Sequence, residues 1–178
     1  MDKKVMIITG SRKGIGKYMA EYYLEKGFRV IGCSRGESDL VHENYEYEQL
    51  DVADEKAVKK FVAGIAKKYG KIDYLINNAG VASMNHSFLT PLSVVEKIFR
   101  TNVFGSFLFM REVGKIMSKK KFGRMVNLTT FAVPFKLEGE AAYAASKAAV
   151  TVMAESLARE YADYGITINT VAPPAVQT

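Results

Sequence analysis

The sequence predicts an α/β protein built on a parallel β-sheet. Short, continuous apolar runs, of the kind that a parallel sheet buries on both faces, alternate with longer stretches of helical periodicity. The first run, at 5–8, leads at once into a glycine-rich segment at 9–16, which opens a helical pattern. Strands that alternate with helices form right-handed βαβ units, so the strands are expected to lie parallel in one sheet.

Length and composition favour one domain. The chain has 178 residues, 48% of them hydrophobic and 25% charged, with no internal repeat, linker or low-complexity tract. No apolar run is long enough to cross a membrane, and the run at residue 5 leaves no room for a signal peptide before it. Cys33 is the only cysteine, so no intrachain disulfide can form. We therefore expect a cytoplasmic protein without membrane association.

The charge balance does not point to a nucleic-acid partner. The formal net charge is +6, and the densest basic run is Lys119-Lys120-Lys121. This run follows a helical pattern and is expected to be a solvated turn. We predict neither a nucleic-acid partner nor a metal site.

The glycine-rich segment has the setting of a dinucleotide-binding turn. It lies between the first strand and a helix whose apolar side carries Ile15, Met19, Tyr22 and Tyr23 and which ends at Gly27. Glycines permit a tight turn and close backbone approach to a pyrophosphate, which the helix N-terminus attracts. A plain connector is the alternative. The residues assigned here to the cofactor site are Gly10, Ser11, Arg12, Lys13, Gly14, Ile15 and Gly16.

The end of the second strand, predicted at 28–33, bears on cofactor choice. In a dinucleotide-binding fold, an acid at this point binds the ribose 2′-hydroxyl, whereas a cation accommodates a 2′-phosphate. Here the strand ends in Ser34 and Arg35, and Lys13 can point toward the same region. Two cations without a carboxylate favour NADP(H) over NAD(H). The alternative is that both are ordinary surface cations.

The next unit is a strand at 45–50, followed by Asp51 and Val52, and then a helix that Asp54 can cap. That helix ends at Gly70. Its apolar stripe is assigned to the core without any chemistry and consists of Val58, Phe61, Val62, Ile65 and Tyr69.

A fourth strand at 73–76 runs into Asn77-Asn78-Ala79-Gly80, at the edge where parallel sheets bind ligands. Ser93 and Glu96, after Pro91, then predict a capping box that opens a helix. This helix is expected to continue past Asn102 to about Met117. Asn102 is polar within an apolar stretch, and its alternative role is a buried side chain bonded to backbone.

The last units are a strand at 125–128, a helix at about 141–164 that stops at Gly165, and a strand at 166–171. The helix carries Tyr143 and Lys147, one turn apart on the same face. A lysine ammonium close to a phenol lowers the tyrosine pKa and produces a proton donor usable nearer neutral pH. An exposed pair on an amphipathic helix is the alternative.

Together, these segments resemble the short-chain dehydrogenase/reductase family along the whole chain. Residues 9–16 match its TGxxxGxG motif, residues 77–80 its NNAG motif, and residues 169–173 the segment after its sixth strand. Asn102, Tyr143 and Lys147 fall where the family has its catalytic residues. The resemblance implies a Rossmann-like, doubly wound parallel sheet of strand order 3-2-1-4-5-6, with helices on both faces.

The resemblance also implies roles. Tyr143 would exchange a proton with the oxygen of a small carbonyl or alcohol substrate while hydride passes between substrate and nicotinamide. Lys147 would hold the nicotinamide ribose and lower the Tyr143 pKa, and Asn102 would organise a proton-relaying water. The remaining cofactor-site residues would be Asp51 and Val52 at the adenine, Pro173, Val176 and Thr178 at the carboxamide, and Asn78, Ala79 and Gly80.

Two positions depart from the family pattern. Thr130 stands where the family usually has serine, although its hydroxyl can donate the same hydrogen bond. Its extra methyl predicts somewhat weaker catalysis, and Thr129 is a second candidate if the loop register differs. Pro174 replaces a glycine, which removes a backbone donor near the nicotinamide.

Two functions from different classes remain open. The first is an NADP(H)-dependent oxidoreductase, and the second is a non-catalytic dinucleotide-binding protein that senses redox state or supports a partner. Family members pair two long helices, and Phe104 and Phe107 lie on the first of the two here, so we expect a homodimer or homotetramer. The family fold continues beyond the position of Thr178, so the chain is expected to lack its C-terminal part and to have weak activity. Apolar loop residues weakly favour a substrate with an apolar portion: Met84, Phe88, Phe131, Val133 and Phe135.

Overall fold

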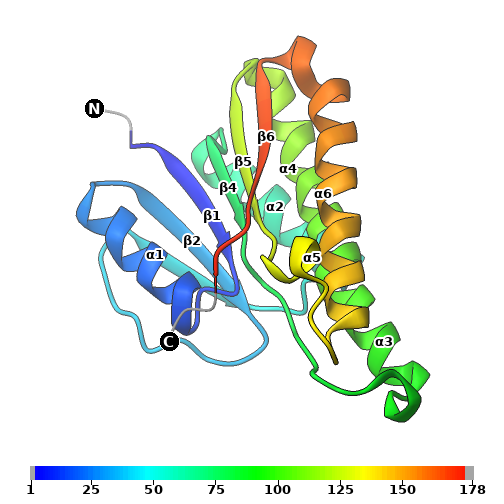
Figure 1. Ribbon diagram of the computed structural model, residues 1–178. Coiled ribbons are helices and arrows are strands. Elements are labelled where there is room, and N and C mark those ends of the chain that lie inside the picture. Colours follow the sequence, from blue (N-terminus) through cyan, green and yellow to red (C-terminus); the bar gives the residue numbers. More distant parts are fainter. Residues whose placement is uncertain (1–2, 175–178) are drawn as a thin grey trace.

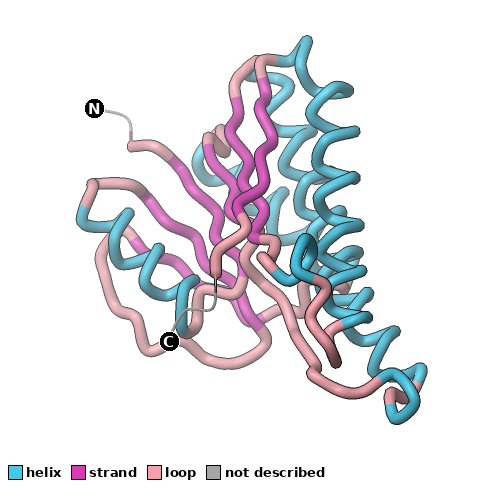
Figure 2. Tube along the Cα trace, viewed as in Figure 1, coloured by secondary structure: helices cyan, strands magenta, loops and turns pink. Residues whose placement is uncertain are grey.

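A computed structural model describes residues 3–174, which contain one parallel sheet of six strands (Figures 1 and 2). The strand order is β3-β2-β1-β4-β5-β6, as predicted. The strands are β1 (Val5–Thr9), β2 (Arg29–Ser34), β3 (Tyr45–Gln49), β4 (Tyr74–Asn77), β5 (Gly123–Leu128) and β6 (Ile166–Val171). The bounds of β6 are as predicted, and those of the other strands differ by one or two residues.

Helices cover both faces of the sheet, unequally (Figure 1). On one face α1 (Gly14–Glu25) packs on β1 and β2. On the other lie α2 (Glu55–Tyr69), α4 (Gly105–Lys120) and α6 (Ala141–Tyr161), with α4 between its two neighbours. Shorter elements are η1 (Ser87–Leu89), α3 (Leu92–Phe99), η2 (Arg100–Phe104), α5 (Ala132–Phe135) and η3 (Ala162–Tyr164).

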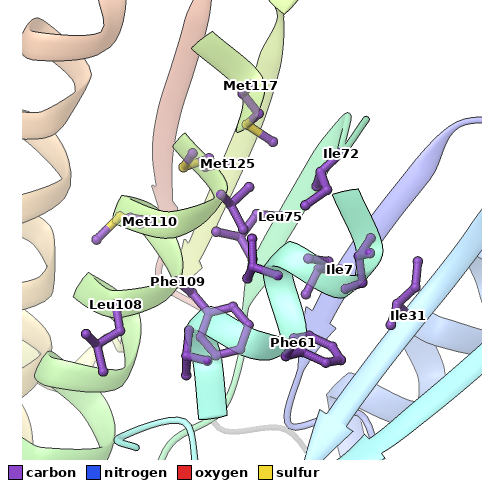
Figure 3. Close-up of a cluster of buried hydrophobic side chains, with 14 of the residues drawn as sticks. Ile7, Ile31, Phe61, Ile72, Leu75, Leu108, Phe109, Met110, Met117 and Met125 are labelled. Atoms are coloured by element: carbon purple, nitrogen blue, oxygen red, sulfur yellow. The ribbon is translucent and has the colours of Figure 1, made fainter. Parts of the chain in front are cut away.

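The side chains along each strand contribute alternately to two apolar cores, one on each face of the sheet, because successive side chains point to opposite faces. Ile7, Leu75 and Met125 face α2 and α4, where Phe61 and Phe109 meet edge to face at 6.1 Å (Figure 3). Met6, Ile8, Val30 and Ile76 face α1, where Ala20 and Leu24 are buried. This burial on both sides accounts for the continuous apolar runs in the sequence.

The predicted cap of α2 is confirmed, because Asp54 Oδ1 accepts hydrogen bonds from the N–H groups of Lys56 at 2.9 Å and Ala57 at 3.0 Å. Four residues of its apolar stripe are buried as expected and Tyr69 is partly buried, and Gly70 ends the helix with φ 71°. For α1 the prediction was partly wrong. Tyr22 is 44% exposed, and the buried face consists of Gly16, Ala20 and Leu24.

The long helical stretch through Asn102 is confirmed, but it is not one regular helix. α3 continues through η2, a single π-helical segment, into α4. The predicted capping box is wrong: the helix begins after Pro91, which occupies the N-cap, and no side chain caps it. Ser93 therefore lies inside the first turn.

Candidate active site

The turn between β1 and α1 has a backbone that only glycine allows at two points. Gly10 adopts φ 70°, in the left-handed region. A Cβ on Gly16 would lie 2.2 Å from the Gly10 carbonyl oxygen and 2.4 Å from Asn78 Nδ2. The turn therefore folds back tightly on itself and leaves the start of α1 open toward the carboxyl ends of the strands.

Hydrogen bonds join this turn to the end of β4. Asn78 Nδ2 donates to the carbonyl oxygens of Thr9 at 3.0 Å and Gly10 at 3.1 Å. The buried Thr9 hydroxyl accepts from the N–H groups of Asn78 at 3.1 Å and Ala79 at 3.0 Å. The two predicted motifs, far apart in sequence, thus form one rigid unit.

A cavity of about 500 Å³ opens over this unit, and most of the predicted cofactor residues line it. Those residues are Gly10, Arg12, Lys13, Gly14, Ile15, Gly16, Ser34, Arg35, Asp51, Val52, Asn78, Ala79 and Gly80. Ser11 does not line it. Its side chain is fully buried, with its hydroxyl 3.0 Å from that of Tyr45. Gly36, Leu50, Val81 and Thr101 also line it and were missed, although all four adjoin predicted site residues in the sequence.

One end of this cavity is basic. The exposed Arg12, Lys13 and Arg35 all line it. Ser34, at the end of β2, accepts a hydrogen bond from the Arg12 N–H at 3.3 Å and donates to the Cys33 carbonyl at 2.7 Å. The carboxylate in the lining is that of Asp51, whose Oδ1 accepts from the Ala53 N–H at 2.9 Å.

A second cavity, of about 380 Å³, adjoins the first and shares Ile15, Asn78, Gly80 and Val81 with it. Three of the predicted catalytic residues, Thr130, Tyr143 and Lys147, line it, whereas Asn102 does not. Its other lining residues are Ala82, Leu128, Thr129, Thr130, Phe131, Glu140, Tyr143, Lys147, Pro173 and Pro174. Val176 and Thr178 lie outside the described residues.

The pKa of Tyr143 is raised and not lowered as expected. Its half-buried position raises the pKa of its phenol above the usual value, and the Glu140 carboxylate raises it further. A hydrogen bond with the Thr130 hydroxyl opposes this and lowers the pKa. Lys147 was expected to lower the pKa of this phenol, but it does not contribute here, because its ammonium donates to the Leu128 carbonyl.

Lys147 is 6% exposed, and burial lowers its pKa to about 8. Its Nζ donates to the Leu128 carbonyl oxygen at 2.6 Å and lies 6.0 Å from the centre of the Tyr143 ring. It also lies close to Gly80, where an added Cβ would come within 3.3 Å of Nζ. The ammonium is thus at the junction of the two cavities.

The structure distinguishes the two threonines. Thr129 donates its hydroxyl hydrogen bond to the Val171 carbonyl of β6 at 3.1 Å. Thr130 is the one whose hydroxyl meets Tyr143, and it also accepts from the Ala132 N–H at 3.2 Å. Of the two threonines, Thr130 is therefore the one whose hydroxyl is free of β6 and acts on the Tyr143 phenol.

Asn102 is fully buried, and its side chain makes three hydrogen bonds within the protein. Its Oδ1 accepts from the Val81 N–H at 2.8 Å. Its Nδ2 donates to the Val81 carbonyl and to Ser146 Oγ, both at 2.9 Å. The alternative role considered from the sequence, a buried amide bonded to backbone, is thus observed. Its carboxamide holds the segment after Gly80 and links η2 to α6.

Two general properties concern residues 3–174 as a whole. None of the helices there is long and apolar enough to span a bilayer. No group of three or more histidine, cysteine, aspartate or glutamate side chains there could hold a metal ion.

The fold and these two cavities define a dinucleotide-binding α/β protein of the oxidoreductase type. Residues 4–178 match the family model described as short chain dehydrogenase. The chain belongs to that family.

Individual relatives agree with this assignment. The chain is 34% identical to the 3-oxoacyl-(acyl-carrier-protein) reductase FabG of Vibrio cholerae, with 100% of this chain and 75% of that protein covered. It is 36% identical to an NAD-dependent glycerol dehydrogenase of Listeria innocua, with 98% and 71% covered. The solved structure of ElxO with NADP bound superposes with a TM-score of 0.93 at 34% identity, covering 99% of this chain and 75% of that one.

Proposed function

We propose that this protein is an NADP(H)-dependent oxidoreductase that interconverts a carbonyl and an alcohol, with Tyr143 as the proton donor and acceptor. The observation that carries the proposal is the junction of the two cavities. One is lined by the glycine turn and the strand ends, and the other by Tyr143, Thr130 and Lys147. Gly80, shared by both, leaves space beside Lys147 Nζ and Asn102 Oδ1, each 3.3 Å from where a Cβ would stand.

A nicotinamide dinucleotide would supply or accept the hydride, and the residues that line the larger cavity would hold it. The turn at Gly10 and Gly16 suits close approach of a pyrophosphate to the start of α1. The protein's own task is then to orient the substrate and to move one proton.

Tyr143 and Thr130 are suited to that proton transfer. The Thr130 hydroxyl lowers the pKa of the Tyr143 phenol, and both side chains line the smaller cavity, so both can face one substrate oxygen. Thr130 donates to that oxygen, and Tyr143 protonates it during reduction or deprotonates the alcohol during oxidation. Because burial raises the phenol pKa, the resting side chain carries the proton that reduction consumes.

The preference for NADP(H) is supported by Arg12, Lys13 and Arg35 at the basic end of the larger cavity, beside Ser34. Cationic side chains bind a phosphate more strongly than neutral ones do. The relatives include proteins that use either cofactor: ElxO has NADP bound, and the Listeria glycerol dehydrogenase is NAD-dependent.

The decisive experiment combines two measurements on the purified protein. We expect NADPH to bind more tightly than NADH in side-by-side titrations. A panel of ketones followed through NADPH absorbance should then reveal turnover. Tight NADPH binding without turnover on any ketone or alcohol would favour the non-catalytic dinucleotide-binding protein, and equal or tighter NADH binding would refute the cofactor preference.

A further inference from the structure

Glu140 is a carboxylate in the smaller cavity that neither the fold nor the proposed proton transfer uses. It occupies the N-cap of α6, three residues before Tyr143, and both side chains line this cavity. The Glu140 carboxylate also raises the pKa of the Tyr143 phenol. Lys147 and Glu140 bear the two formal charges among the side chains that line this cavity.

The carboxylate of Glu140 has no structural duty within residues 3–174. Glu140 occupies the N-cap of α6, but its side chain makes no capping hydrogen bond. Only the backbone of Glu140 forms hydrogen bonds there. Its N–H donates to the Leu137 carbonyl at 3.3 Å, and its carbonyl accepts from the Ala144 N–H at 2.7 Å. The nearby cations are bonded elsewhere, Lys147 to the Leu128 carbonyl and Lys136 to the Val133 carbonyl at 2.7 Å.

We propose that Glu140 is a specificity-determining residue that selects substrates carrying a hydrogen-bond donor, a hydroxyl or an ammonium, next to the reacting carbon, and rejects substrates with an anionic group there. A half-buried carboxylate without a protein partner accepts hydrogen bonds and repels a second anion. Its place one turn from Tyr143 puts that selection beside the atom that Tyr143 protonates. This inference rests on the proposed function, because it concerns the same cavity.

The first test uses four ketones of similar size that differ at one substituent: 3-hydroxybutan-2-one, 3-aminobutan-2-one, 3-methylbutan-2-one and 2-methylacetoacetate. We expect kcat/KM to be higher for the hydroxyl and ammonium compounds than for the carboxylate by at least about tenfold, as like-charge repulsion at short range predicts. Glu140→Gln should remove most of that ratio. Glu138→Gln, an exposed glutamate two residues away that does not line the cavity, is the matched control and should keep it.

The second test does not require turnover. The Tyr143 phenol is titrated by NMR with ring-labelled tyrosine, and Tyr143→Phe identifies its signal. Glu140→Gln should shift the titration to lower pH, because the carboxylate that disfavours the phenolate is gone. Glu138→Gln should leave the titration in place. Binding of the four corresponding alcohols in the presence of NADP⁺ should follow the same order as the ketones.

The outcomes separate this inference from the proposed function. Failure to reduce any of the ketones would count against the reductase, and the tyrosine titration and alcohol binding would still decide the role of Glu140. An unchanged Tyr143 titration, or equal discrimination by the wild type and Glu140→Gln, would overturn the assignment of Glu140.

Discussion

The Lys147 ammonium is the clearest case in which a single residue's surroundings set its chemistry. It is buried, and its hydrogen-bond partner is the neutral carbonyl of Leu128. Burial, with no carboxylate bonded to Nζ within residues 3–174, disfavours the charged form and lowers the pKa to about 8. Folding therefore opposes protonation of this side chain, which makes stability depend on pH.

The pH dependence has a definite sign. Between about pH 8 and the unfolded value of 10.5, the unfolded chain binds more protons at Lys147 than the native chain does, so native stability gains with rising pH. The free energy of unfolding of the wild type, relative to Lys147→Met, should rise by roughly 3 kcal/mol across this range. Urea denaturation of both proteins at several pH values measures it. A difference that stays constant or falls with pH would contradict the burial argument.

Tyr143→Phe should separate chemistry from cofactor binding. The ring remains, but the proton donor is lost, so turnover should fall by about 10²–10⁴-fold while the NADPH dissociation constant stays nearly unchanged. Tyr164→Phe, at a half-exposed tyrosine in η3, is the control and should change neither quantity. A Tyr143→Phe protein with near-normal turnover would exclude the proposed role.

Thr130 offers a finer comparison at the same site. Thr130→Ser retains the hydroxyl that meets Tyr143 and should keep or improve turnover, whereas Thr130→Val keeps the shape and loses the hydrogen bond. We expect Thr130→Val to be at least about tenfold slower, as loss of a donor to a developing oxyanion predicts. Equal rates for the two variants would show that the hydroxyl is unimportant.

Ser34 is the residue through which cofactor choice can be changed. Its hydroxyl accepts a hydrogen bond from the backbone N–H of Arg12, among the cationic residues that line the larger cavity. Ser34→Asp should weaken NADPH binding by about tenfold or more through like-charge repulsion and leave NADH binding unchanged or tighter. The neutral Ser34→Asn is the matched control. If aspartate and asparagine weaken both cofactors alike, the 2′-phosphate does not lie here.

Among the elements, the π-helical segment η2 has a specific function in the fold. Single π-turns inside α-helices are frequent at functional sites. This one carries Asn102, whose amide is held by Val81 on one side and by Ser146 of α6 on the other. Ser146 Oγ also donates to the Tyr143 carbonyl at 2.7 Å, so η2 is connected directly to the turn of α6 that bears the tyrosine.

Ser146→Ala tests that connection. It leaves one N–H of the fully buried Asn102 amide without a partner, which should cost about 1–3 kcal/mol of unfolding free energy. Ser156→Ala in the same helix is the matched control, because its exposed hydroxyl bonds only its own helix, at the Val152 carbonyl. It should change stability by less than about 0.5 kcal/mol. Equal effects in chemical denaturation would argue against a special role for Ser146.

At the scale of the whole molecule, the outer surface of η2, α4 and α6 is unusually apolar. Leu108 and Phe109 are buried, but Phe104 is 56% exposed, Phe107 36% and Val152 63%. Phe104 and Phe107, on the helix expected to pair with its copy, are thus partly exposed. Such a surface is typical of an interface, and we propose that it pairs with its copy in a homodimer or homotetramer.

Phe104→Glu should therefore dissociate the assembly, whereas Val41→Glu, at an apolar residue 92% exposed in the β2–β3 connection, should not. Light scattering at micromolar concentration measures both. A monomeric wild-type protein would refute the proposed pairing.

Much of the fold could be predicted because its signals are local. Continuous apolar runs, glycines after a strand and the Asp54 cap each act within a few residues, and β1, the glycine turn and α2 formed as expected. The errors have local causes too. Pro91 can occupy an N-cap without a side-chain bond, so the capping box of Ser93 and Glu96 was not needed.

The site could be predicted only in outline. Sequence order suggested which residues gather at the strand ends, but not where each side chain points. Ser11 lies in the glycine motif, yet its hydroxyl turns inward to Tyr45. Glu140 was not considered at all, although its spacing of three from Tyr143 was a signal that could have found it.

The sequence by itself determined the order and type of the elements and the family, because hydrophobic period, glycine placement and motif spacing are properties of short segments. Only the tertiary structure decided which hydroxyl meets Tyr143, since β6 takes the bond of Thr129 and leaves Thr130 to the cavity. It also decided the direction of the Tyr143 pKa, which depends on burial and on Lys147 reaching Leu128 instead of the phenol. These outcomes depend on contacts between segments far apart in the chain, which no local pattern encodes.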